Sequence, residues 1–321
     1  QRLGWLLTRG KHRCDVAMVY PVAAVEPDPE RGKRAVRCAF ETGEYLYAHA
    51  VDFDFIDFES VERAKIVNGE LQVAGERFLS IVIPDMQAVR FGMIQKLAEF
   101  ARAGGHVAII GDSPSASDRI GASDPELVSL VNDITSAQPA LPDPQALLNE
   151  LHRRFAPDIL LPDGVKPYFQ HRILGDEQLY MLYGIPAGTE VGLHATGRPV
   201  LLDPFTGAHF ALSVQRVQDE YTFIEFDARF AGLMLVLFDS GAETLEALYS
   251  GPYRDIDFAG EWQCELVPTL DNRYGDYRLP AFDSYIGAEA RSFEYRFDGG
   301  DWQKAAYSYG PRMLLHRGEL D

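Results

Sequence analysis

Two groups of acidic residues could do chemistry, because paired carboxylates are the machinery of glycosidic-bond hydrolysis. That reaction needs one carboxyl group on each side of the sugar, an acid and a base or nucleophile. The first group alternates along a short segment as Asp52, Asp54 and Asp57. The alternative for this group is that its side chains face solvent or cap the following helix. The chain has 48 Asp and Glu residues, so their number alone decides nothing.

The second group of carboxylates lies late in the chain, in a segment rich in Trp, Tyr and Arg. Its members are Glu261, Glu265, Asp271 and Asp276. Sugar surfaces select this composition, since aromatic faces stack on pyranose rings and forked polar groups bind hydroxyls. Domain interfaces select it as well. The candidate ligand or interface residues of this segment are Trp262, Asn272, Arg273, Tyr274 and Asp276.

The histidines and cysteines do not form a metal-binding pattern. The three cysteines, Cys14, Cys38 and Cys264, lie far apart and contain no CxxC pair. No two of the eight histidines are spaced four residues apart, as two ligands on one helix would be. We therefore expect no metal, disulfide framework or cofactor in this chain. The histidines with the least obvious structural role are His12, His152, His171 and His194.

Two predicted strands end in loops where a doubly wound sheet would hold a ligand. Neither residues 83–86 nor residues 110–113 contain the glycine pattern of a nucleotide site. A nucleophile elbow is also missing, because Ser113 precedes a proline and Cys14 precedes its strand. We therefore expect this region to act as a scaffold. An independent amidotransferase-type hydrolase that uses Cys14, Cys38 or Ser113 is disfavoured for the same reason.

An alternation of strands and helices positions these residues in the first part of the chain. Buried or alternating apolar patterns predict strands at residues 15–21, 51–57, 79–84 and 106–110. Helical spacing predicts helices at residues 31–47, which Gly43 could interrupt or end, and 88–103, which Gly104-Gly105 closes. Asn68-Gly69 predicts a tight hairpin. This order is typical of a parallel, doubly wound sheet.

The later part of the chain has a different pattern. A proline-rich stretch at residues 137–144 predicts a linker, and a helix is predicted at residues 145–155. A further β-rich module is expected from Phe258, with its clearest strand at residues 293–297. Between them, runs of β-branched and aromatic residues predict an antiparallel unit with strands at residues 178–183, 199–202, 221–226 and 232–238.

Composition limits the classes of partner. The chain has 321 residues, 46% of them hydrophobic, and a net charge of -18. This length exceeds what one core usually supports. The acidic balance argues against nucleic acid, because phosphate contacts are made by Lys and Arg. It suits a neutral sugar and equally an ordinary soluble protein. No apolar run reaches the roughly 20 residues of a membrane span, so no membrane partner is expected.

The two ends of the sequence predict a piece of a longer protein. The chain starts at Gln1 without a Met or a signal-peptide pattern, and no natural stop signal marks Asp321. The compartment is therefore not indicated by these residues. An export signal upstream would place the protein in the periplasm or outside the cell, and otherwise it would be cytoplasmic.

Three blocks of residues resemble, in order, the region after the catalytic barrel of large multidomain glycoside hydrolases. The order of the blocks is most similar to the α-L-rhamnosidase group, glycoside hydrolase family 106. The first block resembles an amidotransferase-like (flavodoxin-like) domain, in residues 15–21, 52–56, 78–84 and 103–107. The second resembles the β domain next in line, in residues 168–172, 179–183 and 202–207. The third resembles the start of a sugar-binding β-sandwich, in residues 260–262 and 268–280.

The resemblance implies a multidomain protein of the α/β plus all-β class. It comprises a parallel-sheet amidotransferase-like domain at residues 1–136, a linker and helix at 137–157, an antiparallel β domain at 158–250 and the start of a β-sandwich at 251–321. It also implies inverting hydrolysis of α-L-rhamnosides, assisted by calcium, on carboxylates of an upstream (β/α)8 barrel. That barrel is not in these residues, so no catalytic residue can be carried over.

The partners implied by the resemblance are a carbohydrate and the upstream barrel, and the chain alone would be inactive. Related enzymes that act on galactosides share such domains, so the scaffold does not fix the sugar. The alternative from a different class is a non-catalytic carbohydrate-binding or architectural protein, which would bind sugar without turnover.

Overall fold

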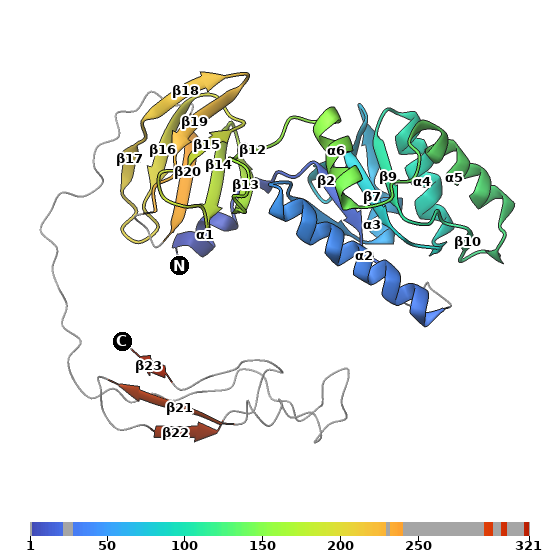
Figure 1. Ribbon diagram of the computed structural model, residues 1–321, viewed down its shortest axis with the longest axis horizontal. Helices are drawn as coiled ribbons and strands as arrows, with labels where there is room; N and C mark the ends of the chain where they lie inside the picture. Colours follow the sequence, from blue (N-terminus) through green and yellow to red (C-terminus); the bar gives the residue numbers. More distant parts are fainter. Residues whose placement is uncertain are drawn as a thin grey trace, which may run out of the picture. The chain divides into compact units, whose positions relative to one another are not determined.

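The computed structural model describes residues 2–21, 28–228 and 232–239, together with three short strands nearer the carboxyl end. The chain separates into two compact units, residues 1–250 and residues 251–321. The first unit has an α/β part, from β2 to α6, and a β part made of α1, β1 and strands β12 to β20 (Figure 1). None of the helices in these described ranges is long and apolar enough to span a membrane.

A four-stranded parallel sheet forms the centre of the α/β part. Its order is β3-β2-β7-β9, and every neighbouring pair is parallel. The apolar runs in the sequence predict all four strands, although the structure makes the second one shorter. The strands are β2 (Val16–Val19), β3 (Phe53–Ile56), β7 (Ser80–Pro84) and β9 (His106–Ile110).

Helices cover both faces of this sheet. One face carries α2 (Pro29–Ala48) and α6 (Pro144–Arg154). The other carries α3 (Phe58–Arg63), α4 (Phe91–Arg102) and α5 (Pro125–Ala137). Successive side chains of β2 alternate between the two cores, with Ala17 and Val19 on one side and Val16 and Met18 on the other. A strand with two buried faces must be apolar throughout, which explains the uninterrupted run.

Three of these helices begin at an Asp-Pro pair. Asp28, Asp124 and Asp143 each accept a hydrogen bond from a backbone N–H of the first turn. The proline that follows each of them has no N–H, and this costs nothing because a backbone N–H at the first helical position has no partner within the helix. The last of these pairs starts α6. The residues before α6 are tied to the sheet, since the Leu141 N–H donates to Ile109 O at 2.7 Å.

The prediction of one helix over residues 88–103 is wrong at its amino end. Ala88–Val89 form the short strand β8, which pairs in parallel with β10 (Ala116–Ser117). β10 also pairs with β11 (Gly121–Ala122). The helix α4 begins only at Phe91, whose N–H donates to Asp118 Oδ1 at 2.8 Å. Helical spacing could not reveal this, because both conformations bury the apolar residues before Phe91.

The predicted hairpin at Asn68-Gly69 is confirmed and extends to three strands. The strands are β4 (Lys65–Val67), β5 (Glu70–Val73) and β6 (Glu76–Phe78), all antiparallel. Asn68 and Gly69 have φ angles of 52° and 78°, as a tight turn with two left-handed residues requires. The second turn, Ala74-Gly75, has the same character, with φ angles of 52° and 87°. We call β4 to β6 the meander.

The β part consists of two antiparallel sheets that share one core. Their orders are β1-β13-β14-β20-β16-β17 and β12-β15-β19-β18. Inward side chains such as Phe169, Tyr180 and Ile224 fill the space between them. All four strands predicted here are confirmed: β14 (Glu177–Tyr183), β16 (Arg198–Leu202), β19 (Tyr221–Glu225) and β20 (Leu233–Asp239). The others are β12 (Ile159–Leu160), β13 (Tyr168–Leu174), β15 (Glu190–Leu193), β17 (His209–Ala211) and β18 (Val214–Gln218).

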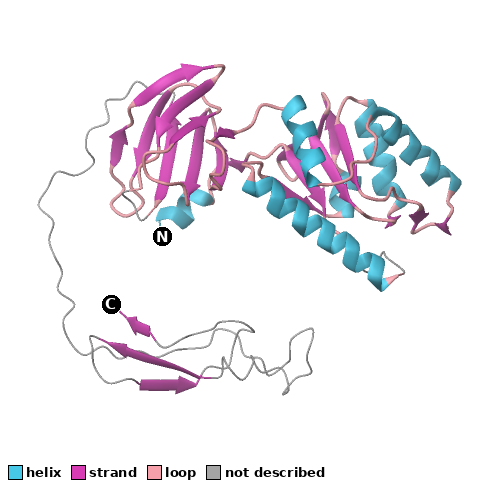
Figure 2. Ribbon diagram, viewed as in Figure 1, coloured by secondary structure: helices cyan, strands magenta, loops and turns pink. Residues whose placement is uncertain are grey.

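The sequence pattern did not predict that the first residues of the chain join the β part. The helix α1 (Arg2–Leu7) lies beside these strands, apart from the other helices (Figure 2). The strand β1 (Lys11–His12) pairs with β13, so that Lys11 lies opposite Ile173 and His12 opposite Arg172. The chain therefore leaves the β part at residue 13 and enters the α/β part at β2.

The second unit is described only by three strands. β21 (Ser292–Phe297) pairs antiparallel with β22 (Gln303–Ala306) and parallel with β23 (Gly318–Leu320). The strand predicted at residues 293–297 is therefore confirmed.

Gly43 does not interrupt α2, and we predict that replacing it destabilises the fold. A methyl group at this buried position would overlap the ring of Phe53. We expect Gly43→Ala to lower the free energy of unfolding by about 1–3 kcal/mol, the usual range for overpacking. The control is Gly4→Ala in α1, which has nothing within 4 Å and should be neutral or stabilising. Urea unfolding measures both, and equal effects would contradict the packing argument.

Candidate functional site

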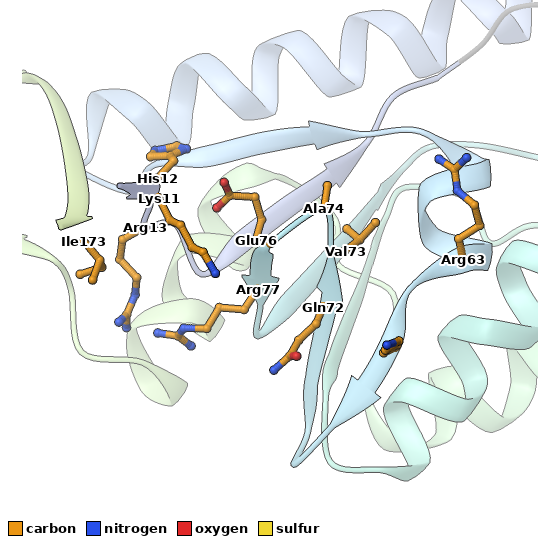
Figure 3. A pocket seen from close by; sticks show the side chains of 12 residues that line it. Lys11, His12, Arg13, Arg63, Gln72, Val73, Ala74, Glu76, Arg77 and Ile173 are labelled. Atoms are coloured by element: carbon orange, nitrogen blue, oxygen red, sulfur yellow. The ribbon is translucent and has the colours of Figure 1, made fainter. Parts of the chain in front are cut away.

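A cavity of about 700 Å³ opens between the meander and β1. It is lined by the meander, by the end of α3 and by the segment that leads from β1 into β2 (Figure 3). In this view Lys11 lies beside Glu76, the guanidinium groups of Arg13 and Arg77 point away from the Glu76 carboxylate, and Arg63 stands well apart from them. Besides His12, the lining contains five Lys and Arg residues and one Glu: Lys11, Arg13, Arg63, Lys65, Glu76 and Arg77.

Positive charge dominates this cavity, although the whole chain is acidic. Two of the five cations are held by carboxylates outside the lining. Arg13 Nε lies 3.1 Å from Asp15 Oδ1, and Arg77 lies 2.9 Å from Glu70 and 3.5 Å from Asp15. These pairs fix the directions of the two guanidinium groups. Glu76 is the one carboxylate among the lining residues.

His12 forms a network with two aspartates beside the cavity. Its Nε2 lies 2.7 Å from Asp52 Oδ2 and its Nδ1 lies 3.1 Å from Asp54 Oδ2. Cys14 donates its S–H to the same Asp54 oxygen at 3.2 Å. The side chains of His12 and Asp52 are only 15% and 9% exposed. The network joins β1, a strand of the β part, to the amino end of β3 in the α/β part.

The charge state of the network follows from its geometry. Burial alone would lower the pKa of His12, but the hydrogen bonds to Asp52 and Asp54 outweigh burial and raise that pKa to about 10. Burial alone would raise the pKa of Asp54, and the hydrogen bond and charge of His12 lower it instead. Burial raises the pKa of the Cys14 thiol, and the charge of Asp54 adds to this. Burial raises the pKa of Asp52, although the hydrogen bond and charge of His12 oppose that rise. The raised pKa of His12 describes an imidazolium that faces the carboxyl groups of Asp52 and Asp54, with a protonated thiol beside it.

Three ligand atoms of this network are close enough to share a metal ion. One atom each of His12, Cys14 and Asp54 lie within 4.8 Å of one another. Nitrogen, sulfur and one carboxylate oxygen suit zinc and not calcium, which takes six to eight oxygen ligands. A metal would also have to displace the protons of both the imidazolium and the thiol. The raised pKa values of these two groups oppose that exchange, so the network is better described as an ion-pair lock.

The carboxyl ends of the parallel strands are closed by a second ion pair. Asp85, directly after β7, has a left-handed φ of 40°, which is strained for an aspartate. Its carboxylate accepts hydrogen bonds from Arg34 at 2.9 Å and from the Asp112 N–H at 3.0 Å. The expectation that these strand ends carry no nucleophile agrees with this arrangement.

The three residues considered as nucleophiles do not form a catalytic arrangement. Cys14 is buried and donates a hydrogen bond from its S–H to Asp54, and its raised pKa keeps it a thiol. Burial raises the pKa of Cys38 to about 11, although a contact with Thr42 opposes the rise. No described residue forms a hydrogen bond with the Ser113 hydroxyl that would make it a nucleophile. A nucleophile needs a free base or a lowered pKa. The pKa values of both cysteines are raised, and the Asp54 carboxylate that accepts from Cys14 is already bound by His12.

The structure separates the first group of predicted acidic residues. Asp57 caps α3 through the Ser60 N–H, as the capping alternative predicts. The solvent-facing alternative is wrong for Asp52, which is buried against His12 because the chain brings β1 beside β3. Asp52 and Asp54 do not face each other across a groove, as the two carboxyl groups of a glycoside hydrolase would. The second group, Glu261, Glu265, Asp271 and Asp276, lies outside the described residues, as do the candidate ligand residues Trp262, Asn272, Arg273 and Tyr274.

The other three histidines that were singled out from the sequence, His152, His171 and His194, have surroundings typical of a structural role. His171 is buried, stacks on Tyr180 and lies 3.3 Å from Asp158. His194 stacks on Tyr221, and burial lowers the pKa of His152. The cavity cations were missed by the sequence analysis. They come from distant positions and each resembles an ordinary solvated charge, so no local signal marks them.

Comparison with known proteins shows a shared fold. The sequence matches no protein-family model and no curated protein. The structure of a rhamnosidase from Novosphingobium sp. PP1Y matches with 21% identity and a TM-score of 0.55, over 78% of this chain and 25% of that chain. The chain thus spans about a quarter of the rhamnosidase's length. At this identity the match establishes a glycoside hydrolase-like fold.

Two further structures match more distantly. A β-galactosidase from Bacillus circulans sp. alkalophilus has 13% identity and a TM-score of 0.46, over 74% of this chain and 43% of that chain. An α-L-fucosidase isoenzyme 2 from Paenibacillus thiaminolyticus has 11% identity and a TM-score of 0.42, over 75% of this chain and 50% of that chain.

The His12 lock predicts a stability that falls as the pH rises. Between the ordinary pKa of 6.5 and the folded value of about 10, the native chain binds a proton that the unfolded chain has lost. The lock therefore contributes fully below pH 6.5, and its contribution disappears through pH 10. In the unaltered protein, we expect the free energy of unfolding to fall by on the order of 3 kcal/mol across this window. His12→Gln should abolish this fall, which urea unfolding at several pH values would measure.

The control for this measurement is His209→Gln on β17, which should keep the slope of the unaltered protein. If His12→Gln also keeps that slope, the imidazolium between Asp52 and Asp54 is not the source of the pH dependence.

Proposed function

We propose that this chain is the scaffold accompanying the catalytic barrel of an α-L-rhamnosidase-like glycoside hydrolase, and that the whole enzyme hydrolyses terminal α-L-rhamnosides. The observation that carries this proposal is the fold likeness to a rhamnosidase over 78% of this chain, with a TM-score of 0.55. The order of the three sequence blocks supports the same group of enzymes. The sugar is taken from the printed name of that relative and from the sequence resemblance.

The described residues support a scaffold role because they hold no pair of facing carboxylates. Glycoside hydrolysis requires two carboxyl groups on opposite sides of the sugar. Glu76 is the one acid in the cavity lining, and Asp52 and Asp54 are both engaged by His12. The reacting carboxylates would therefore come from the upstream barrel. Calcium, if the enzyme uses it, would also be held there, since the His12, Cys14 and Asp54 ligand set does not suit it.

The α/β part would be the amidotransferase-like (flavodoxin-like) domain of such an enzyme. Its parallel sheet supports this assignment, as does the strained residue after β7, where an active relative would need a nucleophile. Here that residue is Asp85, which Arg34 neutralises. In the second unit, the residues proposed to contact sugar or a neighbouring domain are Trp262, Asn272, Arg273, Tyr274 and Asp276.

The first test of the proposal is turnover. We expect this chain alone, with or without calcium, to leave an aryl α-L-rhamnoside unhydrolysed, because the reacting carboxylates are proposed to lie on the upstream barrel. The same chain joined to its upstream coding sequence should release the aryl group. Release by this chain alone at enzymatic rates would show that the active centre is misplaced. No release by the longer protein on rhamnosides would contradict the substrate assignment.

A second candidate function, carbohydrate binding without catalysis, is favoured by one surface feature. Tyr168 and Tyr183 lie opposite each other on β13 and β14, with ring centroids 6.1 Å apart. They are 61% and 49% exposed, and Tyr47 packs behind Tyr168. Exposed aromatic rings offer apolar faces to the C–H side of a neutral pyranose.

This second candidate predicts that the two tyrosines carry neutral-sugar affinity. We expect Tyr168→Ala/Tyr183→Ala to weaken the binding of a rhamnose oligosaccharide roughly tenfold in calorimetric titration, since two stacking contacts are lost. The matched control is Phe205→Ala, which removes an aromatic ring that is 64% exposed on another loop. Equal weakening by both variants would argue against a platform at Tyr168 and Tyr183.

A further inference from the structure

The cavity between the meander and β1 carries a charge opposite to that of the chain. The protein has a net charge of -18, yet five Lys and Arg residues, the His12 imidazolium and one carboxylate line this space. Like charges repel one another in a partly enclosed space, where the local dielectric constant is lower than in water. Lys11, Arg63 and Lys65 are exposed, so water weakens this repulsion, and an anion bound between the cations would weaken it further.

Internal ion pairs do not account for all of these cations. Arg13 and Arg77 are neutralised by Asp15 and Glu70. Lys11 and Lys65 make no ion pair with any described residue. Arg63 has a hydrogen bond to Ser60 Oγ at 3.2 Å as its nearest described partner. Three cationic groups are therefore available to a ligand, and they come from β1, from the end of α3 and from β4.

The rest of the lining distinguishes between classes of ligand. It contains no Phe, Tyr or Trp, the residues that stack on a neutral pyranose. Gln72 and Glu76 instead supply hydrogen-bonding groups among the cations. A bare inorganic anion would be repelled by Glu76, but the hydroxyl groups of a saccharide could donate to it. The volume of about 700 Å³ is within the range of small-molecule sites and exceeds what a single small ion needs.

We propose that this cavity binds an acidic saccharide, one that carries carboxylate or sulfate groups on more than one sugar unit. Lys11 binds an anionic group at one end of the cavity, and Arg63 and Lys65 bind another at the opposite end. Arg77, held in place by Glu70, directs its remaining N–H groups to the ligand. Glu76 accepts hydrogen bonds from sugar hydroxyls. The saccharide identity rests on the proposed function, and the anionic character rests on the cavity alone.

The experiment is a calorimetric titration of the full chain with matched ligands. The probes are trigalacturonate, its methyl ester, a sulfated rhamnose oligosaccharide and inorganic sulfate. The methyl ester keeps the shape of trigalacturonate but removes its charge. Comparing the carboxylated and sulfated probes identifies which anionic group the cavity prefers.

The variant for this titration is Lys11→Ala/Lys65→Ala. Because neither lysine is paired, their removal leaves no carboxylate without a partner. The control is Lys33→Ala/Lys96→Ala, which removes the same positive charge from the exposed pairs with Glu30 and Glu99. We expect the cavity variant to bind the acidic probe roughly tenfold more weakly and the control to bind it unchanged. Binding should also weaken in about 0.5 M salt, which screens exposed charges.

Several outcomes overturn the inference. One is the absence of binding by either acidic probe, and another is equal weakening in the cavity variant and the control. Equal affinity for trigalacturonate and its methyl ester would remove the role of charge. Inorganic sulfate that binds as tightly as the saccharides would show a simple anion site. Selective acidic binding combined with no rhamnoside turnover by the longer protein would defeat the proposed function and leave this inference standing.

Discussion

The bridge that His12 makes between Asp52 and Asp54 is the constraint on which the first unit depends. His12 belongs to β1 and is paired with Arg172 of β13, yet its side chain is bound to the amino end of β3. One imidazolium thus ties the antiparallel sheet of the β part to the parallel sheet of the α/β part. Breaking one partner of a buried ion pair leaves an uncompensated charge, so neither sheet can move away from the other at low cost.

Tyr47 adds a second connection that acts in the same direction. Its hydroxyl donates to Phe169 O at 2.7 Å and accepts from the Phe169 N–H at 3.0 Å, so α2 is fastened to β13. Because hydrogen bonds are directional, these contacts fix the orientation of the two parts as well as the distance between them. The cavity lies beside this junction, and a fixed junction keeps its cations at constant separations. A ligand that fits those separations would lose little free energy in ordering the protein.

The sequence predicted what depends on local pattern and missed what depends on long-range pairing. Four buried strands and the Asn68-Gly69 turn were recognisable because burial and turn geometry leave a mark within a few residues. Pairing of β1 with β13 joins residues more than 150 positions apart, and neither strand shows its partner. The His12 lock was missed for the same reason, since His12 and Asp52 lie 40 residues apart and no periodicity in the sequence relates them. The helix predicted at Ala88 and Val89 was wrong for a different reason, because apolar residues suit a buried strand as well as a helix.

The two ends of the parallel sheet differ in how their charges are paired. Doubly wound sheets normally bind ligands at the carboxyl ends of their strands. Here that end carries the ion pair of Arg34 with Asp85, whose carboxylate also accepts a hydrogen bond from the Asp112 N–H. At the opposite end, His12 consumes the charge of Asp52 and Asp54, which would otherwise repel an anion from the adjoining cavity. The lock therefore joins the two sheets and pairs the charges of Asp52 and Asp54, while Lys11, Arg63 and Lys65 keep no ion-pair partner among the described residues.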